Sequence, residues 1–251
     1  MLQYLVILLD DTSVSYCHYD NRKSEHRLIS LENLKAGILF AMKENLMLQF
    51  VYPHYELPQA YKDAIETIDH SKIAPVEYRD KADVVVLDDW EQLSVSGCDI
   101  QKTYVLRTGK IGFFKNYTIL NEVLDKVLRL NVVLVDIDTF TESDFDVYKS
   151  VLDELALKLK GMYLEGMAPQ LNLLTDRMML DKMNNCNAGV ENITLAPDGK
   201  FYICPAFYLA DDGYSIGSLV EVLDIKNPKL YKLSYAPLCR NCDAYQCKRC
   251  I

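Results

Sequence analysis

Residues 132–159 read VVLVDIDTFTESDFDVYKSVLDELALKL and contain the two patterns that decide the fold. Of the first six, all but Asp136 are apolar and most are β-branched, which is typical of a buried strand. Thr141, with Asp144 three residues later, then predicts the start of a helix. A long helix is expected to follow, with a buried face formed by Phe145, Tyr148, Leu152, Leu155 and Leu159. A strand followed by an amphipathic helix is the repeating unit of parallel α/β folds.

The same alternation extends back to the N-terminus. Further strands are predicted at residues 2–9, 46–52, 84–87 and 103–106. One helix is expected to follow a Ser30 cap with Leu34, Ile38 and Met42 on its apolar stripe, and others at residues 59–68 and 117–127. Five such steps predict an α/β fold with a mainly parallel sheet, built as an incomplete (β/α) barrel-like domain or as an open sheet.

Composition excludes several classes of function. The chain has 251 residues, half of them apolar, and a net charge of -9, which argues against wide contact with nucleic-acid phosphates. The apolar N-terminal run stops at Asp10-Asp11, so neither a signal peptide nor a membrane span is expected. No glycine-rich nucleotide motif follows a strand, so no nucleotide cofactor is predicted. We therefore expect a cytoplasmic protein whose thiols stay reduced.

Acidic residues follow three of the predicted strands. Since ligands of parallel sheets sit at the carboxyl ends of strands, these carboxylates could line an acidic mouth. Aspartate is also the ordinary residue for a turn or a helix cap, and that interpretation is favoured. The residues concerned are Asp10, Asp11, Asp88, Asp89, Asp136 and Asp138.

The eight cysteines are unevenly distributed. Cys17 and Cys98 stand apart, whereas the other six lie within residues 186–251. All four histidines lie within the first 70 residues, so a local metal site in the tail must be all-thiolate or borrow its ligands. The six candidate metal ligands are Cys186, Cys204, Cys239, Cys242, Cys247 and Cys250.

Residues 239–250 hold four of these thiols in two Cys-x2-Cys pairs, a pattern that predicts metal binding. A zinc ribbon usually separates its pairs by about 15–20 residues, whereas the gap here is residues 243–246. A compact four-cysteine zinc site stays open as an alternative to an iron-sulfur cluster. Inert buried thiols and disulfides are weaker alternatives in a reducing compartment.

The tail resembles the SPASM domain. The resemblance lies in the order Cys186-x12-Gly199-x4-Cys204, a long gap and a dense cysteine cluster, with residues 216–219 similar to the hairpin before that cluster. Over its whole length the chain is most similar to the CXXX repeat peptide maturase family. This resemblance implies one or two [4Fe-4S] clusters. It also implies an α/β domain over residues 1–180, similar to a reduced radical S-adenosylmethionine barrel, and a SPASM-like domain over residues 181–251.

The resemblance also implies which cysteines share a cluster. Cys186, Cys204 and Cys250 would serve one cluster and Cys239, Cys242 and Cys247 the other, each one protein ligand short. SPASM domains commonly continue to a further cysteine, so the tail is expected to be reduced or truncated after Ile251.

The front of the chain departs from radical S-adenosylmethionine enzymes. Those enzymes place Cys-x3-Cys-x2-Cys in the loop after the first strand, whereas residues 10–30 contain only Cys17. The chain is therefore not expected to generate the radical itself, and whether it catalyses any step stays open. The resemblance implies a maturation factor that binds a cysteine-repeat precursor peptide and a radical S-adenosylmethionine enzyme. The alternative is a zinc-stabilised interaction module with no redox role.

Overall fold

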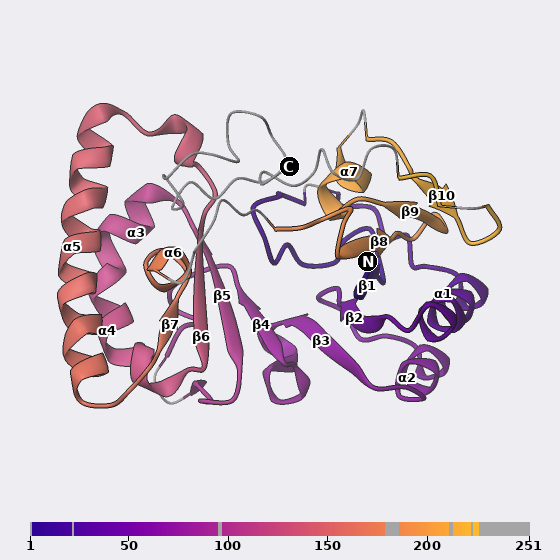
Figure 1. Ribbon diagram of the computed structural model, residues 1–251, viewed down its shortest axis with the longest axis horizontal. Helices are drawn as coiled ribbons and strands as arrows, with labels where there is room; N and C mark the ends of the chain where they lie inside the picture. The colour runs from indigo at the N-terminus through magenta and orange to yellow at the C-terminus, as the bar shows by residue number, and fades with distance from the viewer. Residues whose placement is uncertain are drawn as a thin grey trace.

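The computed structural model describes residues 2–21, 23–94, 97–178, 186–210, 213–221 and 223–225. These residues form one ten-stranded sheet in the order β10-β9-β8-β1-β2-β3-β4-β5-β6-β7 (Figure 1). The strands are β1 Tyr4–Leu8, β2 Met47–Val51, β3 His70–Pro75, β4 Val84–Leu87, β5 Thr103–Thr108, β6 Arg129–Leu134, β7 Gln170–Leu171, β8 Asn192–Leu195, β9 Lys200–Tyr202 and β10 Gly217–Ser218. The helices are α1 Leu31–Glu44, α2 Gln59–Ile65, α3 Lys110–Asn116, α4 Leu120–Val123, α5 Glu142–Leu164, α6 Thr175–Met178 and α7 Pro205–Leu209. Short 3-10 turns are η1 Val76–Lys81, η3 Tyr117–Ile119, η4 Leu124–Lys126 and η5 Ile137–Thr139.

The sheet is wound like part of a barrel. Strands β1 to β7 lie side by side in chain order and every neighbouring pair is parallel. Strand β8 returns to the free side of β1, also in parallel, and β9 and β10 continue from it in antiparallel fashion. Because β7 and β10 are the two edges, the ring of strands is open. The prediction of an α/β fold with a mainly parallel sheet is confirmed, and the free edges show that this sheet is not closed.

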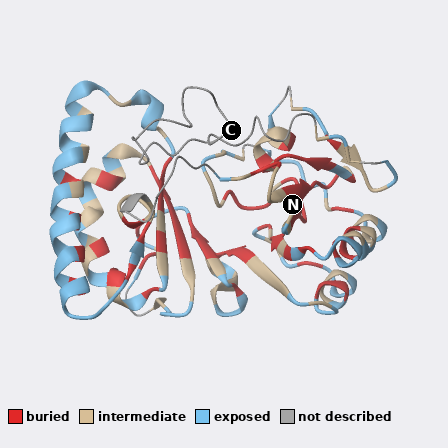
Figure 2. Ribbon diagram, viewed as in Figure 1, coloured by how far each residue is buried: buried red, intermediate tan, exposed pale blue. Residues whose placement is uncertain are grey.

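Alternate residues of each strand face opposite sides of the sheet. Leu5 and Ile7 of β1 face the helix side, where they pack with α1 and α2, and a second helix-side core lies under α3, α4 and α5. Val6 and Leu8 face the other side, where one inward residue from each of β2 to β6 extends the same apolar layer. Figure 2 shows buried strands and an exposed outer surface on α5.

Both predicted helix caps are confirmed. The Ser30 hydroxyl accepts the Asn33 backbone N–H at 3.1 Å, and Thr141 forms a reciprocal capping box with Asp144. Each cap pairs backbone N–H groups that a helix start leaves without intrahelical partners. The cap chemistry in the sequence therefore fixes where α1 and α5 begin.

Two residues assigned to buried helix faces are in fact exposed. Phe145 is 48% exposed, because it lies in the first turn of α5, ahead of the buried stripe that starts at Val151. Met42 is 60% exposed, because the α1 stripe runs from Leu34 to Ala41 and Met42 lies past it. Amphipathic spacing identified both helices correctly, but not where each stripe meets the sheet.

Strands β3, β7, β8 and β9 were not predicted, and the predicted strand that corresponds to β6 was displaced. Strand β3 reads HSKIAP, and its first three residues are only partly buried, so it lacks a continuous apolar run. Strand β6 begins at Arg129 and ends at Leu134, because its register against β5 pairs Arg129 with Thr103 and Leu134 with Thr108. The predicted end of that strand at Ile137 was wrong, since Ile137 begins the turn η5.

Strands β8, β9 and β10 belong to the main sheet, while Cys239, Cys242, Cys247 and Cys250 lie outside the described residues. A separate cysteine-rich domain over residues 181–251 therefore stays a prediction. Within the part of the chain that the structure describes, no helix combines the length and apolar character needed to cross a membrane.

Candidate thiol site

Three cysteines from distant segments line one pocket. Cys17 comes from the loop after β1, Cys186 from the turn before β8, and Cys204 from the end of the β9 segment. The pocket lies on the side of the sheet away from the helices, with Val6 and its β2 partner Gln49 on its wall. Its cavity volume is about 300 Å³. For comparison, an engineered cavity of about 150 Å³ holds benzene, so this cavity has room for a body several atoms across.

A buried arginine holds the Cys17 segment across the sheet. Arg107 of β5 is 8% exposed, and its Nη1 donates to the carbonyl oxygens of Cys17 at 2.9 Å and Tyr19 at 3.1 Å. A longer contact of 3.3 Å reaches the carbonyl of Ser15, and Nη2 pairs with the Asp20 carboxylate at 3.3 Å. Hydrogen bonds from a charged donor are stronger than neutral ones, so Arg107 fixes the backbone that carries Cys17.

The start of the same loop is tied to β2. The Ser13 hydroxyl donates to the Val51 carbonyl at 2.8 Å, and the Val14 N–H donates to the Tyr52 carbonyl at 3.0 Å. The Asn21 side chain donates to the carbonyl of Ser13 at 2.8 Å and so closes the loop on itself. The loop is therefore a fixed part of the pocket wall.

Cys186 and Cys204 are placed by the β8–β9 hairpin. Asn192 Nδ2 donates to the Cys186 carbonyl at 3.2 Å, which joins that cysteine to the first residue of β8. The hairpin turns at Gly199, whose φ of +78° favours glycine, and the Gly199 N–H donates to the Ala196 carbonyl at 3.0 Å. Cys204 follows β9 and precedes Pro205, the first residue of α7. The Gly199-x4-Cys204 spacing thus corresponds to a tight hairpin followed by a short helix.

Two tyrosines lie beside the sulfurs. The rings of Tyr16 and Tyr19 meet edge to face at 5.8 Å. Burial raises the pKa of the Tyr16 hydroxyl above its usual range, and negative charge on each of the three pocket cysteines raises it further. Tyr16 therefore stays protonated near neutral pH.

The donor set is all sulfur, which suits iron-sulfur clusters and zinc. No three His, Cys, Asp or Glu side chains among the described residues are arranged so that they could hold a metal ion. The cysteines on the cavity wall are the residues that would hold such a group, because thiolates are the usual ligands of iron-sulfur clusters. Cys186 and Cys204 are the two predicted ligands that the described residues bring together.

Sequence reasoning missed Cys17. It was classed as isolated because its sequence neighbourhood contains no other cysteine. The available signal was its position in the loop after the first strand, since the pairing of β8 with β1 brings the Cys186 segment to that loop. Cys98 does lie elsewhere, where its thiol contacts the Ser94 carbonyl at 3.2 Å beside the core under α3 to α5.

The aspartates that follow the strands mainly accept hydrogen bonds in turns and at the starts of helices. Asp10 accepts the Thr12 N–H and the Tyr55 hydroxyl, both at 2.8 Å, and Asp136 accepts the Lys110 N–H at 2.9 Å at the start of α3. The favoured interpretation as structural aspartates is therefore confirmed for Asp10 and Asp136.

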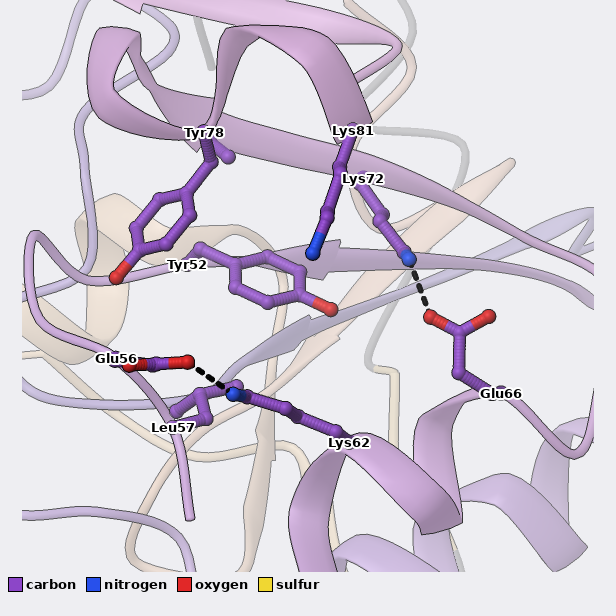
Figure 3. A pocket seen from close by; sticks show the side chains of 9 residues that line it. Tyr52, Glu56, Leu57, Lys62, Glu66, Lys72, Tyr78 and Lys81 are labelled. Carbon is purple, nitrogen blue, oxygen red and sulfur yellow. Dashed lines mark hydrogen bonds and ion pairs between the residues drawn. The ribbon is translucent and has the colours of Figure 1, made fainter. Parts of the chain in front are cut away.

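A second hollow of about 110 Å³ lies on the helix side, between α2 and η1 (Figure 3). It arises because the short turn η1 replaces a helix between β3 and β4. Two ion pairs, Lys62 with Glu56 and Lys72 with Glu66, cross its wall. Burial, and then the charge of Glu66, raises the pKa of the Tyr52 hydroxyl. Because the ammonium groups of Lys62 and Lys72 are already paired with these glutamates, we assign this hollow no function.

Fold and pocket together define an α/β protein with an incomplete barrel and a thiol-lined cavity. No family model and no curated protein matches the chain. Among solved structures it is similar to Streptococcus suis SuiB bound to precursor peptide SuiA, with 12% identity and a TM-score of 0.48 over 96% of this chain and 66% of that one. SuiB bound to S-adenosylmethionine gives 11% identity and 0.48 over 98% and 72%, and SuiB alone gives 12% and 0.47 over 87% and 64%. The chain thus spans about two thirds of SuiB, and at these values its function has to be argued from its own residues.

Proposed function

We propose that this chain is a maturation factor for a ribosomally made, cysteine-repeat peptide, in which a SPASM-like iron-sulfur region binds the peptide or a partner radical S-adenosylmethionine enzyme. The observation that carries the proposal is the meeting of Cys186 and Cys204 on one cavity wall. These are the two described cysteines of the motif that resembles a SPASM domain. In this proposal, maturation of the peptide takes place in the cytoplasm, where thiols stay reduced.

The chemistry of the ligands suggests how a peptide would bind. A cluster with one protein ligand missing offers an iron to an incoming thiolate, and a cysteine-repeat peptide supplies thiolates. The β8–β9 hairpin would hold the sulfurs of Cys186 and Cys204 in place, as the supporting residues around a metal site do. The alternative is a zinc site with a purely structural role, which the all-sulfur donor set also suits.

The test uses the full chain, purified without oxygen and measured for iron, acid-labile sulfide and zinc. A fluorescent peptide with several Cys-x3 repeats is titrated against metal-loaded and chelator-stripped protein, alongside a matched peptide with serine in place of each cysteine. The proposal expects iron and sulfide, and binding that requires both the metal and the peptide cysteines. Zinc without sulfide would support the structural alternative, and equal binding of the serine peptide would overturn the thiolate-capture role.

A further inference from the structure

Cys17 is the pocket residue to which the proposed function gives no role. In the sequence, strands β2 to β7 lie between Cys17 and the other two cysteines, yet Cys17 lines the same cavity as Cys186 and Cys204. These are three of the four cysteines that the structure describes, whereas Cys98 lies beside the core under α3 to α5. If these side chains only filled space in the cavity wall, a small apolar residue at each position would pack equally well. The meeting of three cysteines from separate segments therefore points to a role for their sulfur atoms.

The position of Cys17 is also held at a cost. Arg107 is a buried cation, and its guanidinium donates hydrogen bonds mainly to backbone carbonyls of this loop, including that of Cys17. Burying a charged group carries a desolvation penalty that only well-formed hydrogen bonds offset. The fold therefore uses a strong and specific contact to keep the Cys17 segment at the cavity.

We propose that Cys17 is a ligand of the iron-sulfur cluster held by Cys186 and Cys204, so that the loop after β1 completes a site otherwise formed by the C-terminal segment. This inference rests on the proposed function and deepens it. The ligand set implied by the resemblance did not include Cys17, which lines the cavity beside Cys186 and Cys204.

The cluster would link the loop after β1 to the hairpin before α7, so metal loading should stabilise these two segments together.

The test compares the iron and sulfide content of the full chain with that of Cys17→Ser, Cys204→Ser and the double variant, after anaerobic reconstitution with ferrous iron and sulfide. Cys17→Ser and Cys204→Ser are expected to lose the same cluster, and the double variant is expected to lose no more than Cys204→Ser alone. Cys98→Ser is the matched control and should keep the wild-type metal content and absorption spectrum.

A second measurement needs no variant and so does not depend on folding of a mutant. Cysteine alkylation is followed by mass spectrometry in the loaded wild-type chain and after removal of metal by chelator. Metal-bound thiolates are shielded from alkylation, so Cys17 is expected to react at least about tenfold more slowly in the loaded chain than in the metal-free chain. The alkylation rate of Cys98 should be the same in both.

The outcomes separate the two proposals. A wild-type chain that takes up iron and sulfide while Cys17→Ser keeps the same content and Cys17 is not shielded would overturn the ligand role and leave the proposed function standing. Losses that add up in the double variant would also overturn it, because they would place Cys17 on another cluster. A wild-type chain that takes up no iron would overturn both.

Discussion

Replacing Arg107 tests how the structure positions the thiol pocket. Arg107→Met keeps most of the side chain's volume but removes the donors that hold the loop carbonyls. A hydrogen bond from a charged donor contributes about 1.5–3 kcal/mol. Because the loop is only partly buried and water replaces part of each lost bond, we take the lower value for the two shortest bonds, to Cys17 and Tyr19. The expected loss in the free energy of unfolding is about 3 kcal/mol.

A loss of that size lowers the melting temperature of a chain this long by about 6–12 °C. The variant should also loosen the loop locally. The assay therefore combines a thermal melt with the alkylation rate of Cys17, both on metal-free protein under reducing conditions. Cys17 is expected to react faster in Arg107→Met than in the wild type, because opening of the loop exposes its sulfur.

Arg129→Met is the matched control. Arg129 also lies on a strand and binds Asp176 at 2.6 Å, but it is remote in sequence from the pocket segments and its side chain is more exposed, at 27%. It should lower the melting temperature while the reactivity of Cys17 stays at the wild-type value. The reasoning is refuted if Arg107→Met changes neither quantity, or if both variants accelerate Cys17 equally.

Three further predictions concern the scaffold. Thr141→Ala removes the capping box of α5 and should cost about 1 kcal/mol in a urea titration, whereas an unchanged midpoint would contradict the cap. The Lys110 ammonium and then Thr141 lower the pKa of Asp144 from 3.8 to about 2. The ionised form therefore stabilises the fold above pH 4 and its contribution disappears as the pH falls toward 2. The difference in urea midpoint between wild type and Asp144→Asn should shrink over that range, and a difference independent of pH would refute the assignment. Gly37→Ala places a Cβ 2.4 Å from Leu195 and should destabilise by about 1–3 kcal/mol. Gly161→Ala, where nothing lies within 4 Å, should instead stabilise by up to about 1 kcal/mol.

Local chemistry explains which elements could be predicted from the sequence. Strands β1 and β4 are continuous apolar runs, β2 and β5 are mainly apolar at their centres, and the start of α5 is specified by Thr141 and Asp144. Strand β3 was missed because its first residues are polar and only partly buried. Its pairing with β2 and β4 is a tertiary effect that periodicity does not report.

The candidate site was only partly predictable for the same reason. The Gly199-x4-Cys204 spacing entered only as part of the resemblance, and the structure shows that it corresponds to a β8–β9 hairpin that turns at Gly199. The position of Cys17 beside Cys186 depends on β8 pairing with β1, a contact between strands that are far apart in the sequence. Local spacing cannot reveal such a contact, and no motif marks Arg107 as the residue that holds the loop.

Iron and acid-labile sulfide, counted per chain in protein expressed and purified without oxygen, test the central claim most directly. The account predicts roughly equal amounts of iron and sulfide in the wild type and a clear loss of both in Cys186→Ser, because a [4Fe-4S] cluster contains as many sulfides as irons. A folded wild-type chain with neither iron nor sulfide, after reconstitution with both, would contradict it.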